Sequence, residues 1–144
     1  MLLNLSNHAA TKWSAEQKQA ATRDFGEIRD LAFPAIDPAA NLDGIIALAQ
    51  EYVQRCQEQF DGIQKPASSI KSQRSGDPAS AGDRVHAIHV MGEMTFVYQF
   101  VKLATAAGLR CVASTTERRT VDHPDGSKTS EFRFVRFREY EPLD

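Results

Sequence analysis

Long hydrophobic runs are missing from this sequence, since no apolar stretch approaches the roughly 18 residues that a membrane-spanning helix requires. The opening residues MLLNLSNHAATKW also lack the basic segment and the long apolar segment of a secretory signal peptide. The sequence therefore predicts neither a membrane span nor an export signal, and we expect a cytoplasmic protein.

Cysteine is also scarce, and there is no excess of positive charge. The only two cysteines, Cys56 and Cys111, lie within apolar patterns, which is typical of buried thiols in a reducing compartment. Neither has His or further Cys at ligand spacing, so we expect no metal and no cofactor. A formal net charge of −2 excludes a generally basic nucleic-acid coat, and duplex nucleic acid is not expected as a partner.

Three common catalytic signatures are absent as well. No G-x-G-x-x-G or G-x-x-x-x-G-K-[ST] motif occurs, which argues against the usual forms of NAD binding and ATP hydrolysis. No G-x-S-x-G motif supplies a hydrolase nucleophile. The composition, with 42% hydrophobic and 25% charged residues, is typical of a single globular domain that spans residues 1–144.

Apolar periodicity divides the first part of the chain into extended segments and helices. The residues MLLNL suit a buried strand. The capping box of Ser14 with Gln17 predicts a helix that runs to about Arg23. A second extended segment is expected over residues 25–36.

A long amphipathic helix is predicted next, with Asp37-Pro38 as its cap and first-turn proline. Its apolar residues recur at helical spacing: Ile45, Ala49, Tyr52, Val53, Cys56 and Phe60. Residues 62–84 then lose this periodicity and become rich in Gly, Pro, Ser and Lys. That composition favours a flexible loop, with a lid over a site as the alternative.

The second part of the chain predicts two strands around a helix, and then a hairpin. VHAIHVM, residues 85–91, carries apolar residues on both alternating faces, as expected of a central strand. Thr95 is expected to cap the next helix and Gly108 to end it. LRCVASTT follows as a strand, and DHPDG makes the turn of an antiparallel hairpin between ERRTV and KTSEFRFVRFREY.

The predicted order of elements is β-α-β-α-β-α-β followed by this hairpin. It is typical of an α/β fold: a Rossmann-like open, mainly parallel sheet with helices on both faces and a C-terminal antiparallel hairpin. In the last strand, Phe132 and Phe134 share one face. Val135 and Phe137 fall on the other face, so we expect a β-bulge near Phe134.

Polar residues follow three of the predicted parallel strands. Ligands of such sheets bind outside the carboxyl ends of the strands, so we expect these residues to form one pocket. The candidate site residues are Ser6, Asn7, His8, Lys12, Ser14, Gly92, Glu93, Met94, Thr95, Ser114, Thr115, Thr116 and Arg118. Each group also has a structural interpretation, as turn residues, as a tight strand–helix turn with a cap, or as ordinary strand threonines.

The residue types favour a ligand that contains phosphate. His8 lies near Lys12, where an acid–base or phosphate-contacting group would be useful, and Arg118 can engage a phosphate bidentately. Backbone N–H groups after Gly92 could accept a phosphate at a helix N-terminus. Glu93 would repel that phosphate, and fits better as an acceptor for ribose hydroxyls or as an ion-pair partner of Arg118. The other histidines are interpreted as structural or solvated: His86, His89 and His123.

With LLNLSNH, VMGEMTF and VASTTER at its strand ends, the chain resembles small stand-alone proteins of type III CRISPR systems. These proteins have a CRISPR-associated Rossmann fold (CARF), and several are ring nucleases. The resemblance covers about residues 1–61 and 85–140. It implies a homodimer whose two equivalent pockets hold a cyclic oligoadenylate, with cyclic tetra-adenylate as the first expectation.

The resemblance further implies cleavage without metal, in which a ribose 2′-hydroxyl attacks the adjacent phosphate, leaves a 2′,3′-cyclic phosphate and ends the antiviral signal. Asn7 and His8 would orient or deprotonate the 2′-hydroxyl. Lys12 and Arg118 would bind the scissile phosphate. The turn at 92–95 would receive a neighbouring phosphate or ribose.

The floor of the pocket would be lined by Ser114 and Thr115.

Two alternatives remain open at this point. The first is a non-catalytic nucleotide sensor with the same pocket. The second is a small protein-interaction module that uses the arginines of the last strand: Arg133, Arg136 and Arg138.

Overall fold

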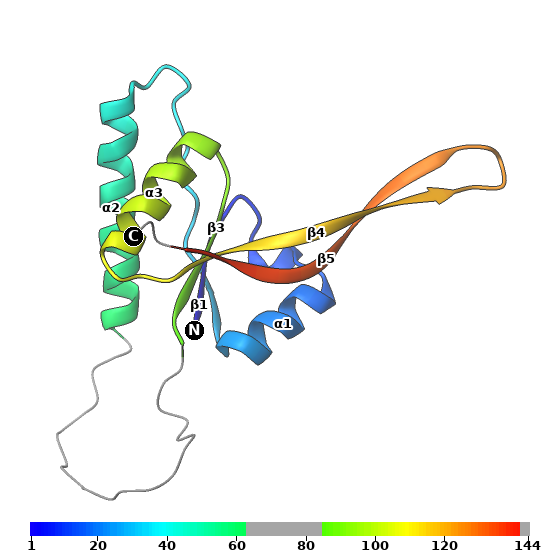
Figure 1. Cartoon of the computed structure of the whole chain (residues 1–144), viewed down its shortest axis with the longest axis horizontal. Coiled ribbons are helices and arrows are strands. Elements are labelled where there is room, and N and C mark those ends of the chain that lie inside the picture. Colours follow the sequence, from blue (N-terminus) through cyan, green and yellow to red (C-terminus); the bar gives the residue numbers. More distant parts are fainter. Residues whose placement is uncertain (63–84, 142–144) are drawn as a thin grey trace, which may run out of the picture.

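The structure is a computed structural model that describes residues 1–62 and 85–141, so the predicted loop over 62–84 lies outside the described residues except for Gly62. The described part contains five strands, three α-helices and one short 3₁₀ helix (Figure 1). Their bounds are β1 Leu2–Ser6, η1 Ala10–Lys12, α1 Ala15–Phe25, β2 Ile28–Asp30, α2 Leu42–Asp61, β3 Ala87–Met91, α3 Met94–Ala106, β4 Cys111–Asp122 and β5 Lys128–Tyr140.

The strands form a sheet in the order β2-β1-β3-β4-β5. Neighbouring strands run parallel from β2 to β4, whereas β4 and β5 are antiparallel. This arrangement confirms the predicted α/β fold with a mainly parallel sheet and a C-terminal hairpin. The predicted segments LRCVASTT and ERRTV belong to one continuous strand, β4.

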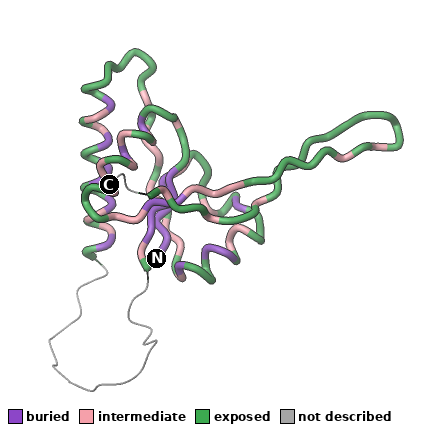
Figure 2. The backbone as a smooth tube through the Cα atoms, in the orientation of Figure 1, coloured by how far each residue is buried: buried purple, intermediate pink, exposed green. Residues whose placement is uncertain are grey.

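Side chains of the central strands alternate between two apolar layers, as the sequence predicted for residues 85–91. On one face, Leu3 of β1 and Ile88 of β3 pack in a cluster with residues of α2 and α3. On the other face, Leu2 and Ala87 pack with Phe25 of α1. Helices therefore cover both faces, and the buried residues gather where the strands run between them (Figure 2).

The first two helices confirm most of what their sequences predicted. Ser14 caps α1, because its hydroxyl accepts a hydrogen bond from the N–H of Gln17. The prediction that Asp37-Pro38 starts the second helix is wrong, since α2 begins at Leu42 and is capped by Asn41. Its buried residues are nevertheless the six that the periodicity predicted.

This cap and the extended segment before it are corrected because other interactions take over. The carboxylate of Asp37 accepts the N–H of Ala39 and closes a local turn instead of capping a helix. Only Ile28–Asp30 of the extended segment 25–36 pairs in the sheet. Beyond it, Leu31, Phe33 and Ile36 pack against the cluster under α2 and α3.

The third helix has a different cap from the predicted one. The carboxylate of Glu93, and not the hydroxyl of Thr95, accepts the first free N–H groups of α3. At the other end, Gly108 has a φ of 79°, a left-handed conformation that glycine adopts without strain and that commonly ends a helix. Within the described ranges, no helix combines the length and apolar character that crossing a membrane would demand.

The two cysteines are buried free thiols, as predicted. Cys56 lies on α2 and Cys111 at the start of β4, in the same apolar cluster. Burial raises the pKa of each thiol to about 12, so both remain protonated at neutral pH.

The hairpin of β4 and β5 continues far beyond the sheet core as a two-stranded arm (Figure 1). We define the arm as residues 117–133, most of which are exposed. Near its base, Thr115 pairs with Arg136 and Thr116 with Phe134, so Val135 is an extra residue in β5. The predicted β-bulge is therefore confirmed.

Candidate functional site

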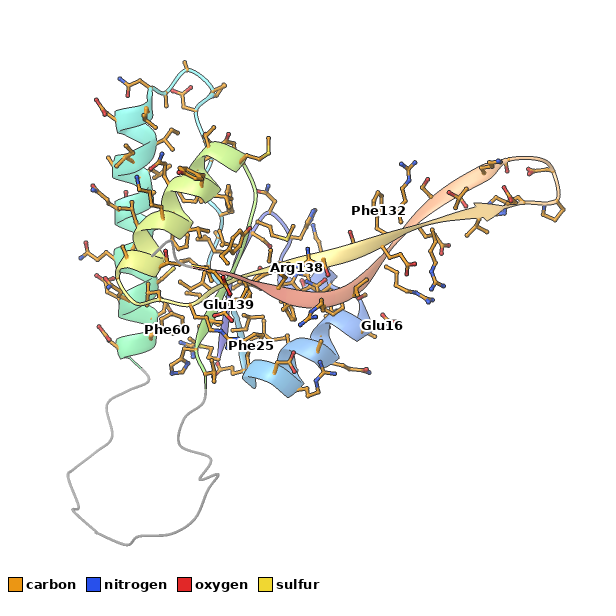
Figure 3. All side chains as sticks on the ribbon, in the orientation of Figure 1. Glu16, Phe25, Phe60, Phe132, Arg138 and Glu139 are labelled. Carbon is orange, nitrogen blue, oxygen red and sulfur yellow. The ribbon has the colours of Figure 1, made fainter. Side chains whose placement is uncertain are left out.

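A pocket of about 720 Å³ lies at the carboxyl ends of β1 and β3 and beside the first half of β4, on the face of the sheet that α1 covers. Its rim continues over η1 and the first turn of α1, and onto β5 where the arm leaves the core. Phe132 lies on β5 within the arm (Figure 3). Its side chain is 71% exposed. Strand ends, helix start and arm thus enclose one space.

Eight of the thirteen predicted site residues line this pocket: Ser6, Asn7, His8, Lys12, Ser14, Gly92, Ser114 and Thr116. They come from the end of β1 with the following η1 and α1 cap, from the end of β3 and from β4, and the parallel pairing of β1, β3 and β4 brings them together. This is the arrangement expected for an open α/β sheet.

The other five residues, Glu93, Met94, Thr95, Thr115 and Arg118, are not part of the pocket lining. The hydroxyl of Thr115 donates to the carbonyl of Arg136 across the hairpin. The guanidinium of Arg118 donates to the hydroxyl of Ser130, at 3.2 Å from Nε and 3.0 Å from Nη2. Both side chains are thus engaged in hydrogen bonds with β5.

The carboxylate of Glu93 occupies the turn that was considered as a phosphate site. It accepts the N–H of Thr95 at 3.2 Å, the N–H of Phe96 at 2.8 Å and the hydroxyl of Thr95 at 2.7 Å. These hydrogen bonds, foremost that from Phe96, lower the pKa of the carboxyl group. The N-terminus of α3 therefore already holds an anion, and that anion belongs to the chain itself.

Gly92 is required at this corner because of a close approach. A Cβ added to it would lie 2.3 Å from the ring of Phe33. Phe33 packs edge-to-face on Phe96, with ring centroids 5.2 Å apart, and so belongs to the core under α3. The glycine lets β3 turn into α3 directly against that ring.

A row of hydrogen-bonded polar side chains crosses the sheet below the pocket. Asn4 donates from Nδ2 to Oδ1 of Asp30 at 2.7 Å. Its Oδ1 lies 2.9 Å from Nδ1 of His89, and Nε2 of His89 lies 3.1 Å from the hydroxyl of Ser114. The four residues come from β2, β1, β3 and β4, so the row spans four adjacent strands. We call it the polar row.

His89 is the buried centre of the polar row. It is 2% exposed, and its ring packs edge-to-face on Trp13 and Phe137, with centroids 5.1 Å and 5.6 Å away. Burial lowers the pKa of His89 to about 4, so the imidazole is neutral at physiological pH. His89 also lines the pocket, through the edge that faces Ser114.

His89 is a hydrogen-bonded structural residue, as predicted, but the prediction missed that it also lines the pocket. The sequence does contain a signal: LLNLS and AIHVM each place one polar residue at the centre of an apolar strand. The register pairs Asn4 with both Asp30 and His89. Buried polar residues on adjacent strands are expected to satisfy one another, and that rule would have predicted the row.

Three aromatic side chains of the lining were also missed: Trp13, Phe132 and Phe134. The indole of Trp13 donates to the carbonyl of His8 at 3.2 Å, which ties the loop after β1 to the start of α1. Phe134 packs on Phe137 with ring centroids 5.0 Å apart. The lining therefore combines aromatic rings with hydroxyl groups.

The charges around the pocket favour an anion. Lys12 is the only Lys or Arg in the lining, and no Asp or Glu lines it within the described part of the chain. The described residues also contain no group of three or more His, Cys, Asp and Glu side chains placed to hold a metal ion.

Comparison with known proteins gives one family. No curated protein and no solved structure matches the chain. The model of the family described as "Uncharacterized protein MJ1673 family" matches residues 1–138, which is nearly the whole sequence. The chain therefore belongs to the MJ1673 family.

Proposed function

We propose that the protein binds a cyclic oligoadenylate in the pocket at its strand ends and cleaves it without a metal ion, as a ring nuclease that ends type III CRISPR signalling in the cytoplasm. The observation that carries the proposal is the make-up of the lining. One lysine, several hydroxyl and amide groups and three aromatic rings surround a space of about 720 Å³, and none of the residues that the structure describes lines it with a carboxylate.

Each part of an oligoadenylate finds a complementary surface in this pocket. Adenine rings stack on aromatic side chains, and Phe132 and Phe134 offer such faces, whereas Trp13 is only 7% exposed. The ammonium group of Lys12 attracts a phosphate. Ribose hydroxyls match the hydroxyl and amide groups of the lining: Ser6, Asn7, Ser14, Gln17, Ser114 and Thr116.

The proposed cleavage uses a nucleophile that the ligand itself carries. The 2′-oxygen of one ribose forms a bond to the adjacent phosphorus, and the bond from phosphorus to the 5′-oxygen of the next nucleotide breaks. The products are a 2′,3′-cyclic phosphate and a 5′-hydroxyl, which takes its proton from solvent. Asn7 and His8 orient the attacking ribose, and Lys12 stabilises the negative charge that grows on the phosphate oxygens.

The symmetry of the ligand leads to the proposed assembly. A cyclic tetra-adenylate has a twofold axis, so a homodimer with two equivalent pockets on its own twofold axis would contact it twice in the same way. Each subunit would then cut one of two opposite phosphodiester bonds. Cyclic tetra-adenylate is therefore the first ring to examine.

The test incubates the purified protein with cyclic tri-, tetra- and hexa-adenylate in EDTA and follows the products by chromatography. We expect linear products with a 2′,3′-cyclic phosphate from one ring, and at least a tenfold slower reaction for Lys12→Ala, because the growing charge loses its cation. Lys128→Ala, at the far end of the arm, is the matched control and keeps the rate.

Three other outcomes would each contradict the proposal in a different way. Intact rings that raise the melting temperature would replace the nuclease with a non-catalytic sensor. Intact rings with no thermal shift would remove both nucleotide functions and favour an interaction module. Cleavage that Lys12→Ala leaves unchanged would place the reaction outside this pocket.

A further inference from the structure

The direction of every hydrogen bond in the polar row can be assigned, starting from Asn4. Its Nδ2 lies 2.7 Å from Oδ1 of Asp30 and 2.8 Å from the carbonyl oxygen of His8, and both of these atoms can only accept. A flipped amide would place its oxygen against both acceptors. Nδ2 is therefore the donor to both atoms, and Oδ1 of Asn4 points toward β3.

The orientation of Asn4 fixes the tautomer of His89. Oδ1 of Asn4 has no proton to give, and it lies 2.9 Å from Nδ1 of His89. The hydroxyl of Ser6 donates to the same oxygen at 2.8 Å. Nδ1 of His89 must therefore carry the proton. Because burial keeps the imidazole neutral, Nε2 then carries a lone pair and can only accept.

The tautomer of His89 in turn orients Ser114, at the edge of the pocket. Its hydroxyl lies 3.1 Å from Nε2 of His89 and 3.0 Å from the sulfur of Met91. A thioether sulfur is a weak acceptor, whereas the imidazole nitrogen is a strong one. The proton of Ser114 therefore points to His89, and the lone pairs of its oxygen remain for the pocket.

We infer that Ser114 is the hydrogen-bond acceptor for a ligand hydroxyl, namely the attacking 2′-hydroxyl of a ribonucleotide, and that Asp30, Asn4 and His89 hold it in that role. This inference rests on the proposed function, which supplies the ribonucleotide. It adds the group that distinguishes ribose from deoxyribose. Ser114 touches the ligand, whereas the other three are positioning residues that act through it.

The hydrogen bond to Ser114 also orients the 2′-hydroxyl for its reaction. As the 2′-oxygen bonds to phosphorus, its proton leaves to solvent, and the leaving 5′-oxygen takes a proton from solvent. His89 stays neutral throughout, because burial holds its pKa at about 4. No proton and no electron is gained or lost overall.

The first test requires no ligand. Nitrogen-15 NMR of the imidazoles should show the Nδ1–H tautomer for His89, which is the less common form for a free neutral histidine. In Asn4→Ala, which removes the acceptor of the Nδ1 proton, this preference should fall, whereas Thr116→Ala should keep it. A proton found on Nε2 of His89 would make His89 the donor to Ser114. The hydroxyl of Ser114 would then be free to donate to the ligand, which would overturn the inference.

The second test compares the binding of cyclic tetra-adenylate with that of its all-2′-deoxy counterpart by rapid mixing, before the ring is cleaved. In the wild type we expect about a hundredfold weaker binding of the deoxy ring, since it loses one hydrogen bond in each of the two pockets of the dimer and each contributes roughly 1.4 kcal/mol. In Ser114→Ala the ratio should fall by about the same factor. The deoxy ring also differs in sugar conformation, but that difference acts equally on every variant and cancels when the ratios are compared.

Thr120→Ala is the matched control, because it removes an exposed hydroxyl of β4 outside the pocket and should preserve the wild-type ratio. Ring binding by the wild type without discrimination would overturn the inference and leave the proposed function intact. Failure of both rings to bind would overturn the proposed function, and the tautomer of His89 would still report separately on the polar row.

Discussion

The sheet core and the arm are held together in different ways, although β4 and β5 run through both. In the core, apolar layers cover both faces of the sheet, and the buried polar groups of Asn4 and His89 bond to one another. In the arm, two strands pair with each other and with little else, and their side chains are mostly exposed.

This difference indicates that the core, and not the arm, provides most of the free energy of unfolding. A two-stranded hairpin in water is marginally stable on its own, so the arm depends on its attachment to the core. The core does not depend on the arm in the same degree. Changes in the core should therefore alter the global free energy of unfolding, whereas changes in the arm should act locally.

The largest contrast is expected between two phenylalanines. Phe96 is fully buried, with the rings of Phe33, Tyr52 and Phe100 around it at 5.2, 5.9 and 6.0 Å. Phe96→Ala should lower the free energy of unfolding by about 3–5 kcal/mol, because it removes a buried ring and leaves a cavity. Phe132→Ala should change it by less than about 0.5 kcal/mol. Urea unfolding of the two variants measures both, and equal losses would contradict the contrast.

A change of intermediate size is expected from acid, through His89. Its pKa in the folded protein, about 4, lies below its ordinary value of 6.5, so the unfolded chain binds the proton more readily. The stabilising contribution is fully present above about pH 6.5 and is lost as the pH falls toward 4. The total loss is about 3 kcal/mol, from roughly 1.4 kcal/mol per pKa unit.

Unfolding curves of the wild type and of His89→Gln between pH 7 and pH 4 test this prediction, since the variant should lose most of the slope. His86 is the control, because burial also lowers its pKa but it is far more accessible. His86→Gln should keep most of the slope. If the wild type is equally stable at both ends of the range, His89 is not held neutral by burial.

The smallest effects are expected from two ion pairs on the hairpin. At the core end, Arg110 contacts Glu139 with two hydrogen bonds, of 2.8 and 3.0 Å. In the arm, Arg119 makes one contact of 3.5 Å with Glu117. Glu139→Gln should cost about 0.5–1 kcal/mol and Glu117→Gln nothing measurable, because exposed single contacts are weak. Thermal unfolding at low and high salt compares them, and the reverse order would show that the arm carries global stability.

The architecture could be predicted from the sequence because its signals are periodic. The six apolar residues of α2, the two covered faces of β3 and the bulge in β5 all follow from counting positions. The start of α2 could not, because Asp37-Pro38 has the composition of a helix cap and of a turn alike. In the structure the Asp37 carboxylate accepts a hydrogen bond from the N–H of Ala39 and closes a turn. This turn follows Ile36, which packs against the core.

The site was predicted in outline for the same reason, since strand ends meet wherever strands are parallel. What the sequence did not predict depends on partners that are distant along the chain. Glu93 looked like a ligand group and instead caps its own helix. His89 looked like a structural residue and also lines the pocket, which became visible only when the register placed it between Asn4 and Ser114.

Because of the extra residue in β5, the arm can change in length without changing which side chains line the pocket. A strand alternates its side chains with a period of two, and Val135 shifts that alternation by one position. As a result Phe132 and Phe134 face the pocket, while Phe137, beyond the shift, still packs under α1. Paired insertions at the tip of the hairpin would lengthen the arm and leave these three rings in phase. Deletion of Val135 alone would put the aromatic wall of the pocket out of phase with the core that supports it.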